Sequence, residues 1–297
     1  MSSQLIFQLI WNGLVSGSLI ALVALGLTLV YGIAGFIQFA HGELVAWGAY
    51  SFMVLHKLMH WPILPSILGS IIILLAIGIL TEKLFFRPVR DKNPMIPLVS
   101  SIGLSIGFQS IILMIFGPNI LTITDKSYKS LPLLQGQILA TPNQILALLC
   151  SVVLIISLGA FLKYTKVGKS LRAVASNREL AQSFGLSIDK AMSWIFGIGA
   201  VLACLAGIFL GFEQNLEPLM GVVIGVKAFS ALILGGVGSI RGAIVGAYAI
   251  GLLESLLVGL SLIPSGFTAA IPFIILILML LIKPEGLFGK RHVALRR

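Results

Sequence analysis

Long uncharged hydrophobic runs recur along the chain, and short polar segments separate them. Most runs have about 20 residues, the length that an α-helix needs to cross the roughly 30 Å hydrocarbon core of a bilayer. The pattern predicts an all-α, polytopic integral membrane protein of eight or nine transmembrane helices, with residues 1–297 forming one transmembrane domain. Eight spans result if a re-entrant pair lies within residues 31–57 or 219–262. The predicted spans cover residues 4–30, 36–57, 62–85, 95–116, 143–162, 191–212, 219–237, 242–262 and 266–282.

The composition is that of a membrane protein and excludes a soluble one. Hydrophobic residues make up 58% of the chain and charged residues 10%, whereas soluble domains carry about one quarter charged residues. The first hydrophobic run lacks the positive region and small-residue cleavage site of a signal peptide, so we expect it to be retained as a span. Cys150 and Cys204 lie in apolar runs without a partner at metal-ligand spacing. We therefore expect no disulfide framework and no metal site.

Basic residues are concentrated in three segments, and their positions predict the orientation of the chain. Fifteen of the twenty lysines and arginines lie in Lys83–Lys92, Lys163–Lys190 and Lys283–Arg297. Short cytoplasmic loops beside transmembrane helices carry such an excess. We therefore expect these segments and the C-terminus to be cytoplasmic, with the loop Gly117–Asn143 and the hairpin around Glu213 outside. The net charge of +10 then reflects topology and some affinity for anionic membrane lipid, not a nucleic acid partner.

Two glycine-rich stretches, Tyr31–Glu43 and Gly235–Gly242, interrupt the apolar pattern beside ionisable residues. Glycine destabilises helices, and a broken helix at membrane depth is tolerated only where protein or a water-filled cavity covers it. Interrupted segments in both halves of a membrane protein also point to a transport pathway. We predict broken helices at the glycines of these stretches, namely Gly32, Gly35, Gly42, Gly235, Gly236 and Gly238.

Two carboxylates lie within apolar sequence, where an ionisable side chain is costly and suggests function. For Glu43 the alternative is a helix end on the cytoplasmic side, and for Glu254 it is an inward-facing residue bonded to a neighbouring helix. Lys227 either pairs with a carboxylate or extends to the outer interface, and we interpret it as extending to the interface.

Other polar residues in the apolar runs are also candidates for a pathway. His41 either titrates near neutral pH or forms a structural hydrogen bond, and the second interpretation is favoured. Asn12 and Ser16 share one helix face and either hold helices together or line a path. The complete set of pathway candidates is Asn12, Ser16, His41, Glu43 and Glu254.

The sequence carries no motif of an enzyme. Gly168-Lys169-Ser170 resembles the end of a phosphate-binding loop, but that motif requires a preceding strand and a glycine where Lys163 stands. A zinc-binding His-Glu-x-x-His helix, a Gly-x-Ser-x-Gly segment and a paired-carboxylate site are also missing from the sequence. We therefore expect neither catalysis nor a cofactor bound by this chain.

The central basic segment contains a pattern of a different kind. Glu179-x-Ala181-x-x-x-Gly185, followed by Ile195, resembles the ATPase-coupling loop of bacterial ABC importer permeases. That loop reads Glu-Ala-Ala, three residues, Gly, nine residues and Ile-x-Leu-Pro, and this chain departs from it at Leu180 and at Gly197-Ile198. The resemblance implies a coupling role for Arg172, Arg178, Glu179, Ala181 and Gly185.

Segments along the whole chain are similar to those of LivH-type permeases of branched-chain amino acid ABC importers. The most specific are Phe39-Ala40-His41-Gly42-Glu43 and Gly235-Gly236-Val237-Gly238-Ser239. The resemblance implies a bacterial cytoplasmic-membrane importer of leucine, isoleucine and valine. Its other components would be a second, LivM-type permease subunit, two cytoplasmic subunits that bind the ATP, and a periplasmic binding protein. Urea and short-chain amides are alternative substrates, because the closely similar urea permeases share these segments.

Overall fold

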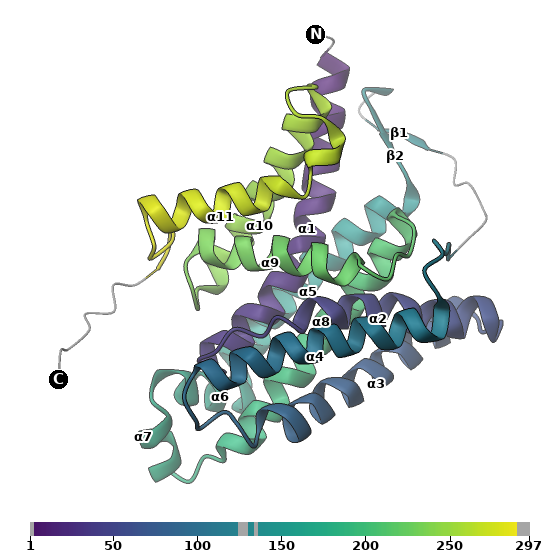
Figure 1. The fold of residues 1–297 in the computed structure, drawn as a ribbon. Helices are drawn as coiled ribbons and strands as arrows, with labels where there is room; N and C mark the ends of the chain where they lie inside the picture. Colours follow the sequence, from purple (N-terminus) through teal and green to yellow (C-terminus); the bar gives the residue numbers. More distant parts are fainter. Residues whose placement is uncertain (1–2, 124–129, 134–135, 290–297) are drawn as a thin grey trace.

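The computed structural model describes residues 3–123, 130–133 and 136–289 (Figure 1). The remaining residues of the loop Gly117–Asn143 and residues 290–297, with the C-terminus that we expect to be cytoplasmic, lie outside the described residues. The helices are α1 Ser3–Ala34, α2 His41–Met53, α3 Ile63–Thr81, α4 Met95–Phe116, α5 Pro142–Tyr164, α6 Lys166–Ser176, α7 Arg178–Ser183, α8 Ile188–Glu213, α9 Met220–Gly235, α10 Ile240–Gly259 and α11 Ala270–Ile282. Two strands, β1 Leu131–Leu133 and β2 Ile138–Ala140, form an antiparallel hairpin.

Helix length and composition confirm the helical membrane architecture. Within the described residues, six helices are long and apolar enough to span a bilayer: α1, α4, α5, α8, α10, and α3 with its π-helical extension to Phe86. Helices α9 and α11 are apolar but shorter. The predicted span over residues 36–57 begins only at His41, because residues 35–40 are not helical. The number of spans, eight or nine, stays a prediction.

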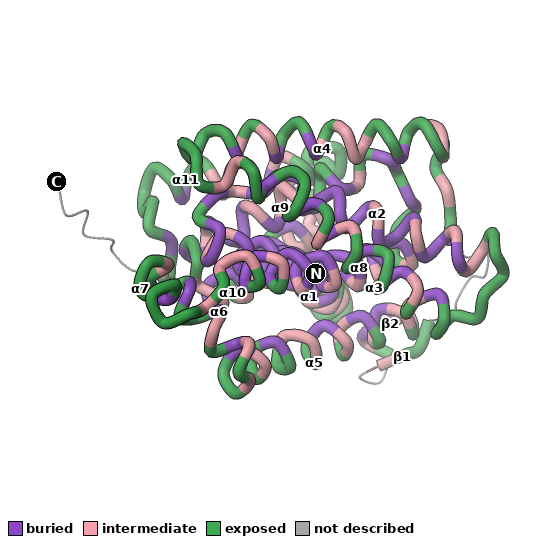
Figure 2. Tube along the Cα trace, turned by 90° about the horizontal axis from the view of Figure 1, so that it is seen from below, coloured by how far each residue is buried: buried purple, intermediate pink, exposed green. Residues whose placement is uncertain are grey.

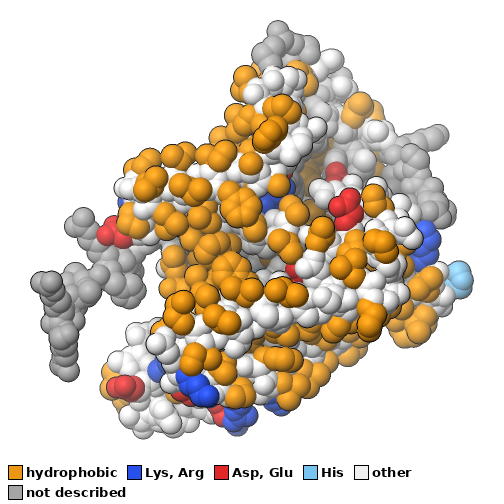
Figure 3. All heavy atoms as spheres, in the orientation of Figure 1, with side chains coloured by type: hydrophobic (Ala, Val, Ile, Leu, Met, Phe, Trp, Pro, Cys, Tyr) orange, Lys and Arg blue, Asp and Glu red, His pale blue; other side chains and the backbone are white. Residues whose placement is uncertain are grey.

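Helices α1, α2 and α8 form the centre of the molecule, and α3, α4, α5 and α11 surround them (Figure 2). In the most apolar part of α1, 89% of the residues are buried, compared with 17% in α4. A helix that is apolar on all sides is buried in protein or faces lipid. Accordingly α1 is a core helix, while the apolar side chains that cover the face over α4 and α11 (Figure 3) suit a lipid environment.

Small residues allow the core helices to approach closely. Gly13 and Gly17 of α1 lie against the backbone of Gly251 and Tyr248 of α10, so that a side chain on either α1 glycine would meet main-chain atoms. Close backbone approach at small residues is how helices gain packing energy in a membrane, where lipid tails are as apolar as leucine. Helices α1 and α10 are therefore closely packed against each other.

The end of the molecule opposite α6 and α7 is joined by polar contacts. Thr141 and Gln144 form a capping box at the start of α5. The Gln144 amide also donates to Glu213 at 2.7 Å and accepts from the indole N–H of Trp11 at 3.0 Å, so that α5, α8 and α1 meet there. The β-hairpin was not predicted, because its strands have three residues each and carry little hydrophobic pattern.

The glycine-rich stretches contain real breaks, but not at every predicted glycine. Gly35 and Gly236 have φ angles of +76° and +102°, which residues with a Cβ rarely adopt, and each follows the end of a helix. Gly32 lies inside α1 and Gly42 inside the first turn of α2, so neither breaks a helix. Gly42 is needed instead for contact, since a Cβ there would lie 2.8 Å from the Cα of Gly225 on α9.

Candidate functional site

The break between α1 and α2 holds a cluster of buried polar side chains. Gln38 lies in the break, and His41 and Glu43 occupy the first turn of α2; their exposed fractions are 1%, 2% and 0%. The ring of His41 fits against the backbone of Gly26 on α1 and Gly199 on α8, where any larger residue would displace it. The two central helices thus leave room for polar side chains at membrane depth because both carry glycine there.

The hydrogen bonding of this cluster is incomplete. Glu43 Oε1 accepts a 3.3 Å hydrogen bond from Ser105 of α4, whereas its Oε2 has no hydrogen-bond partner among the described residues. Both amide atoms of Gln38 are likewise buried without a partner in the described part of the chain. Buried polar groups are nearly always hydrogen-bonded, and each exception costs about 1–3 kcal/mol. Such a cluster is expected where water or a solute supplies the missing partner.

A cavity of about 200 Å³ lies beside these residues. Gln38, His41 and Ser105 give it a polar part, and Phe39 and Phe229 give it aromatic walls. Val23 and Leu27 of α1 and residues of α9 and α11 complete its lining. The cavity is smaller than the roughly 300–1,000 Å³ of sites for larger ligands. Its size and mixed lining suit a small molecule with one polar and one apolar end.

Two of the predicted pathway residues lie far from this cavity. Asn12 precedes Gly26 by 14 positions, which is about 21 Å along a helix at 1.5 Å per residue. Asn12 is exposed and accepts a 3.2 Å hydrogen bond from Gln8, and Ser16 lies only one turn further along α1. The structure does not bring Asn12 or Ser16 together with His41, because the length of one continuous helix keeps them apart.

Glu254 belongs to a separate site. Its Oε1 accepts a hydrogen bond from Lys227 Nζ at 2.5 Å, which forms an ion pair between α10 and α9 with both side chains mostly buried. Lys227 therefore does not extend to the interface, and that interpretation was wrong. Gly225, which packs on Gly42, precedes Lys227 by two positions, and successive residues are about 100° apart around a helix. The ion pair thus lies on a different side of α9 from the cavity.

The coupling segment folds as two short helices with well-formed ends. The side chain of Thr165 caps α6 by accepting from the N–H of Gly168 at 2.9 Å, and Asn177 caps α7 by accepting from the N–H of Leu180 at 3.0 Å. Threonine and asparagine are favoured at this position because they satisfy N–H groups that lack helical partners. Gly185, with φ +79°, then ends the α7 turn and directs the chain into α8.

Arg178 connects this segment to the central helix. Its guanidinium donates to the carbonyl oxygens of Ile33 and Ala34, the latter at 2.6 Å, at the C-terminal end of α1. The last carbonyls of a helix have no partners within it, and a cation there also interacts favourably with the helix dipole. Burial lowers the pKa of Arg178, although an arginine stays charged at neutral pH. Helix α7 is therefore fastened to the end of α1.

The remaining residues of α7 divide into an inner and an outer side. Ala181 is buried, so it packs inward instead of facing a partner, whereas Glu179 is exposed. Leu180 and Phe184 are 57% and 84% exposed, and residues four apart lie on one helix face. This outer apolar pair was not predicted from the sequence, where Leu180 counted only as a departure from a pattern. Arg172 is exposed on α6 and donates to the carbonyl of Lys163 at 3.3 Å.

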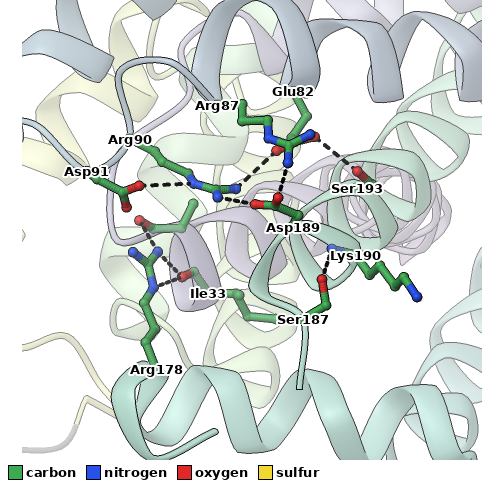
Figure 4. A network of polar contacts seen from close by, with 11 residues as sticks. Ile33, Glu82, Arg87, Arg90, Asp91, Arg178, Ser187, Asp189, Lys190 and Ser193 are labelled. Atoms are coloured by element: carbon green, nitrogen blue, oxygen red, sulfur yellow. Dashed lines mark hydrogen bonds and ion pairs between the residues drawn. The ribbon is translucent and has the colours of Figure 1, made fainter. Parts of the chain in front are cut away.

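A charged network lies next to this connection (Figure 4). Arg87 and Arg90, which follow the end of α3, both donate to the carboxylate of Asp189 at the start of α8. Glu82 accepts from Arg90 at 3.3 Å and from Ser193 at 3.0 Å. Burial alone would lower the pKa of Arg90, but its hydrogen bond with Asp189 raises it above the ordinary value. The basic residues of this segment were interpreted only as an orientation signal, yet they join α3 to α8.

Comparison with known proteins gives consistent matches over most of the chain. A family described as "Branched-chain amino acid transport system / permease component" matches residues 9–280. LivH, the permease protein of the high-affinity branched-chain amino acid transport system of Salmonella typhimurium, is 35% identical, and the alignment covers 99% of each chain. The corresponding permease protein BraD of Pseudomonas aeruginosa is 33% identical, with 96% of each chain covered.

One solved structure resembles the fold. In the structure of PsaBC from Streptococcus pneumoniae in complex with Fab, one chain superimposes with a TM-score of 0.52 and 13% sequence identity. The superposition covers 92% of this chain and 91% of the other. At that identity the likeness concerns the arrangement of helices alone.

Proposed function

The chain belongs to the family of permease components of branched-chain amino acid transport systems, and from this premise we propose that it forms half of the membrane pathway of an ATP-driven importer of leucine, isoleucine and valine. A second, LivM-type permease subunit forms the other half. Two cytoplasmic subunits bind the ATP, and a periplasmic binding protein delivers the amino acid. The chain lies in the bacterial cytoplasmic membrane with its basic segments and C-terminus on the cytoplasmic side.

The cavity beside Gln38 and His41 supports a pathway for a zwitterion with an apolar side chain. Moving charged amino and carboxylate groups into hydrocarbon without partners costs many kcal/mol, so a protein route must supply hydrogen-bonding groups at membrane depth. Gln38 has amide donors and an acceptor without partners in the described part of the chain, and the Phe39 and Phe229 rings offer apolar contact. In this proposal the polar atoms meet the charged end of the amino acid, and the rings meet its side chain.

The observation that carries the coupling part of the proposal is the bonding of Arg178 to the end of α1. Helix α1 supplies Val23 and Leu27 to the cavity wall. A displacement of α7 by an ATPase subunit would thus move a helix that lines the cavity, without a long chain of intermediate contacts. Such a coupling shifts the balance between states open to either side, provided that nucleotide binding favours one of them.

The outer side of α7 provides the contact for the ATPase subunit in this proposal. A short helix that presents apolar anchors at positions i and i+4 suits a hydrophobic groove on a partner. Leu180 and Phe184 are such anchors, and Glu179 beside them offers a charge for orientation. The opposite end of the molecule, where Gln144 meets Glu213, would receive the binding protein.

The decisive experiment measures ATP-driven uptake by the complete importer in proteoliposomes. We expect radiolabelled leucine to accumulate, unlabelled isoleucine and valine to compete, and urea and acetamide not to compete. Liposomes that contain this chain alone should show no leucine flux. Competition by urea would indicate that the importer carries urea instead of branched-chain amino acids. Rapid leucine flux through the chain alone would contradict the dependence on an ATPase.

A further inference from the structure

A wide groove opens on the lipid-facing side of the molecule and shares no lining residue with the cavity. It has a volume of about 850 Å³ and lies between α3 and α5, over a strip of α8. Helix α3 packs on α8 while α5 packs mainly on α1, so the two flanking helices leave that strip of α8 uncovered. The apolar part of the groove is lined by Leu75, Ile79, Leu154, Leu158, Phe161 and Val201.

One end of this groove is basic. Lys83, Arg87 and Lys190 line it, together with Asp189. Asp189 already pairs with Arg87 and Arg90, so it does not neutralise the lysines. Neither Lys83 nor Lys190 forms an ion pair with any described residue, and the Lys190 side chain extends away from the charged network (Figure 4).

An aromatic side chain marks the depth of this basic end. Trp194 of α8 lines the groove and is 51% exposed, one turn beyond Lys190. Tryptophan is enriched at the level of lipid head groups, because its ring is apolar and its N–H is polar. The charged end of the groove therefore lies at the head-group level and its apolar end at the level of the acyl chains.

We propose that this groove binds an anionic phospholipid, with the phosphate of the head group between Lys83 and Lys190 and an acyl chain along the uncovered strip of α8. Basic pockets between transmembrane helices bind anionic lipid head groups in this way. A helix of a partner subunit is the other conceivable occupant of an apolar groove. It would cover two lysines that form no ion pair with a described residue, and burying an unpaired charge in a protein interface is costly. The charge of the groove thus favours a lipid.

The proposal is tested by native mass spectrometry of the purified importer after exchange into equal amounts of phosphatidylglycerol and phosphatidylcholine. We expect preferential retention of phosphatidylglycerol. The double variant Lys83→Gln/Lys190→Gln should lower this retention about 25-fold, since each basic residue near an anionic head group contributes roughly a fivefold factor. The matched control Lys166→Gln/Lys169→Gln removes the same charge from α6, outside the groove, and should retain phosphatidylglycerol as the unmodified chain does.

A second pair of variants tests the apolar part without changing charge. Ser157→Trp places a ring in the groove and should displace the acyl chain, whereas Val153→Trp, which is lipid-exposed on the same helix outside the groove, should not. Unchanged retention in both the lysine and the Ser157 variants would overturn the proposal. Efficient photocrosslinking of a benzophenone maleimide attached to Ser157→Cys to another subunit in native membranes would also overturn it, because the groove would then be a protein interface.

Discussion

The two intramembrane carboxylates, Glu43 and Glu254, were equivalent in the sequence but lie in contrasting surroundings. Glu254 has a cation, Lys227 at 2.5 Å, on the neighbouring helix. Glu43 has only the Ser105 hydroxyl and no cationic partner among the described residues, and Ser105 itself lines the cavity. One carboxylate oxygen of each residue lacks a hydrogen-bond partner among the described residues, so the difference between them is the counter-charge. A buried charge with its own counter-charge holds helices together, whereas a buried polar cluster without one, next to a cavity, is suited to receive a solute. From this contrast we infer a structural role for the ion pair between α9 and α10 and a role in transport for the polar cluster at the α1–α2 break.

The largest expected effect comes from removing one partner of the ion pair. Glu254→Ala leaves Lys227 buried without a counter-charge, and breaking such a pair costs about 3–5 kcal/mol. We expect a large loss of thermal stability of the purified complex. The double variant Lys227→Met/Glu254→Leu should recover most of the stability and retain leucine uptake. If the double variant folds well but cannot transport, Glu254 belongs to the pathway and the contrast with Glu43 fails.

The connection between α7 and α1 gives the next largest effect. Arg178→Ala removes charge-assisted hydrogen bonds, which contribute roughly 1.5–3 kcal/mol, and the lower end applies because Arg178 is half-buried. ATP-driven uptake should fall about tenfold, since about 1.4 kcal/mol is tenfold in an equilibrium. ATP hydrolysis should continue at a rate that exceeds this reduced transport. Lys169→Ala removes a neighbouring exposed charge on α6 and serves as the control; an equal loss in both variants would exclude a specific role for Arg178.

Substitutions at two glycines test the contact between the start of α2 and α9. Gly42→Ala places a methyl group against the backbone of Gly221 and Gly225, and such overpacking costs roughly 1–3 kcal/mol. Gly32→Ala is the matched control, because a Cβ there has no atom within 4 Å and alanine favours a helix by roughly 0.5–1 kcal/mol. Unfolding of the two variants in the same detergent should therefore shift in opposite directions. Equal shifts would mean that the close approach of α2 and α9 is unimportant.

The smallest expected change in stability concerns Gln38. Gln38→Met keeps the unbranched shape but removes amide atoms that have no partner among the residues that the structure describes, so stability should stay the same or rise by up to about 3 kcal/mol. Leucine uptake should nevertheless fall, because the cavity loses polar atoms that face the solute. A stabilised variant with normal uptake would place the solute elsewhere.

The amino-acid pattern predicted most of the helical architecture for clear physical reasons, and it singled out His41 and Glu43, which the structure buries together at the start of α2. Span length and basic clusters follow from the bilayer itself, so the helices were found to within a few residues. The α1–α2 break was visible in its glycines, but Gly32 and Gly42 could not be distinguished from Gly35, because helix packing and backbone reversal both select glycine. The partner of Lys227 lies 27 positions away in sequence, and only the packing of α9 on α10 brings them together. The same holds for Arg178 and the end of α1, separated by 144 positions.

The most direct test of the account asks whether the cavity opens to water under the control of α7. The reporter is Phe229→Cys in a chain whose native cysteines are replaced by Cys150→Ser and Cys204→Ala, assembled into the importer in nanodiscs. A water-soluble thiol reagent should label the reporter, leucine should slow the labelling, and a non-hydrolysable ATP analogue should change its rate. Adding Arg178→Ala should remove most of the effect of the ATP analogue on the labelling rate. The effect of leucine should remain. The account would be contradicted if the reporter stays unlabelled in every state. It would also be contradicted if neither leucine nor the nucleotide changes the labelling rate.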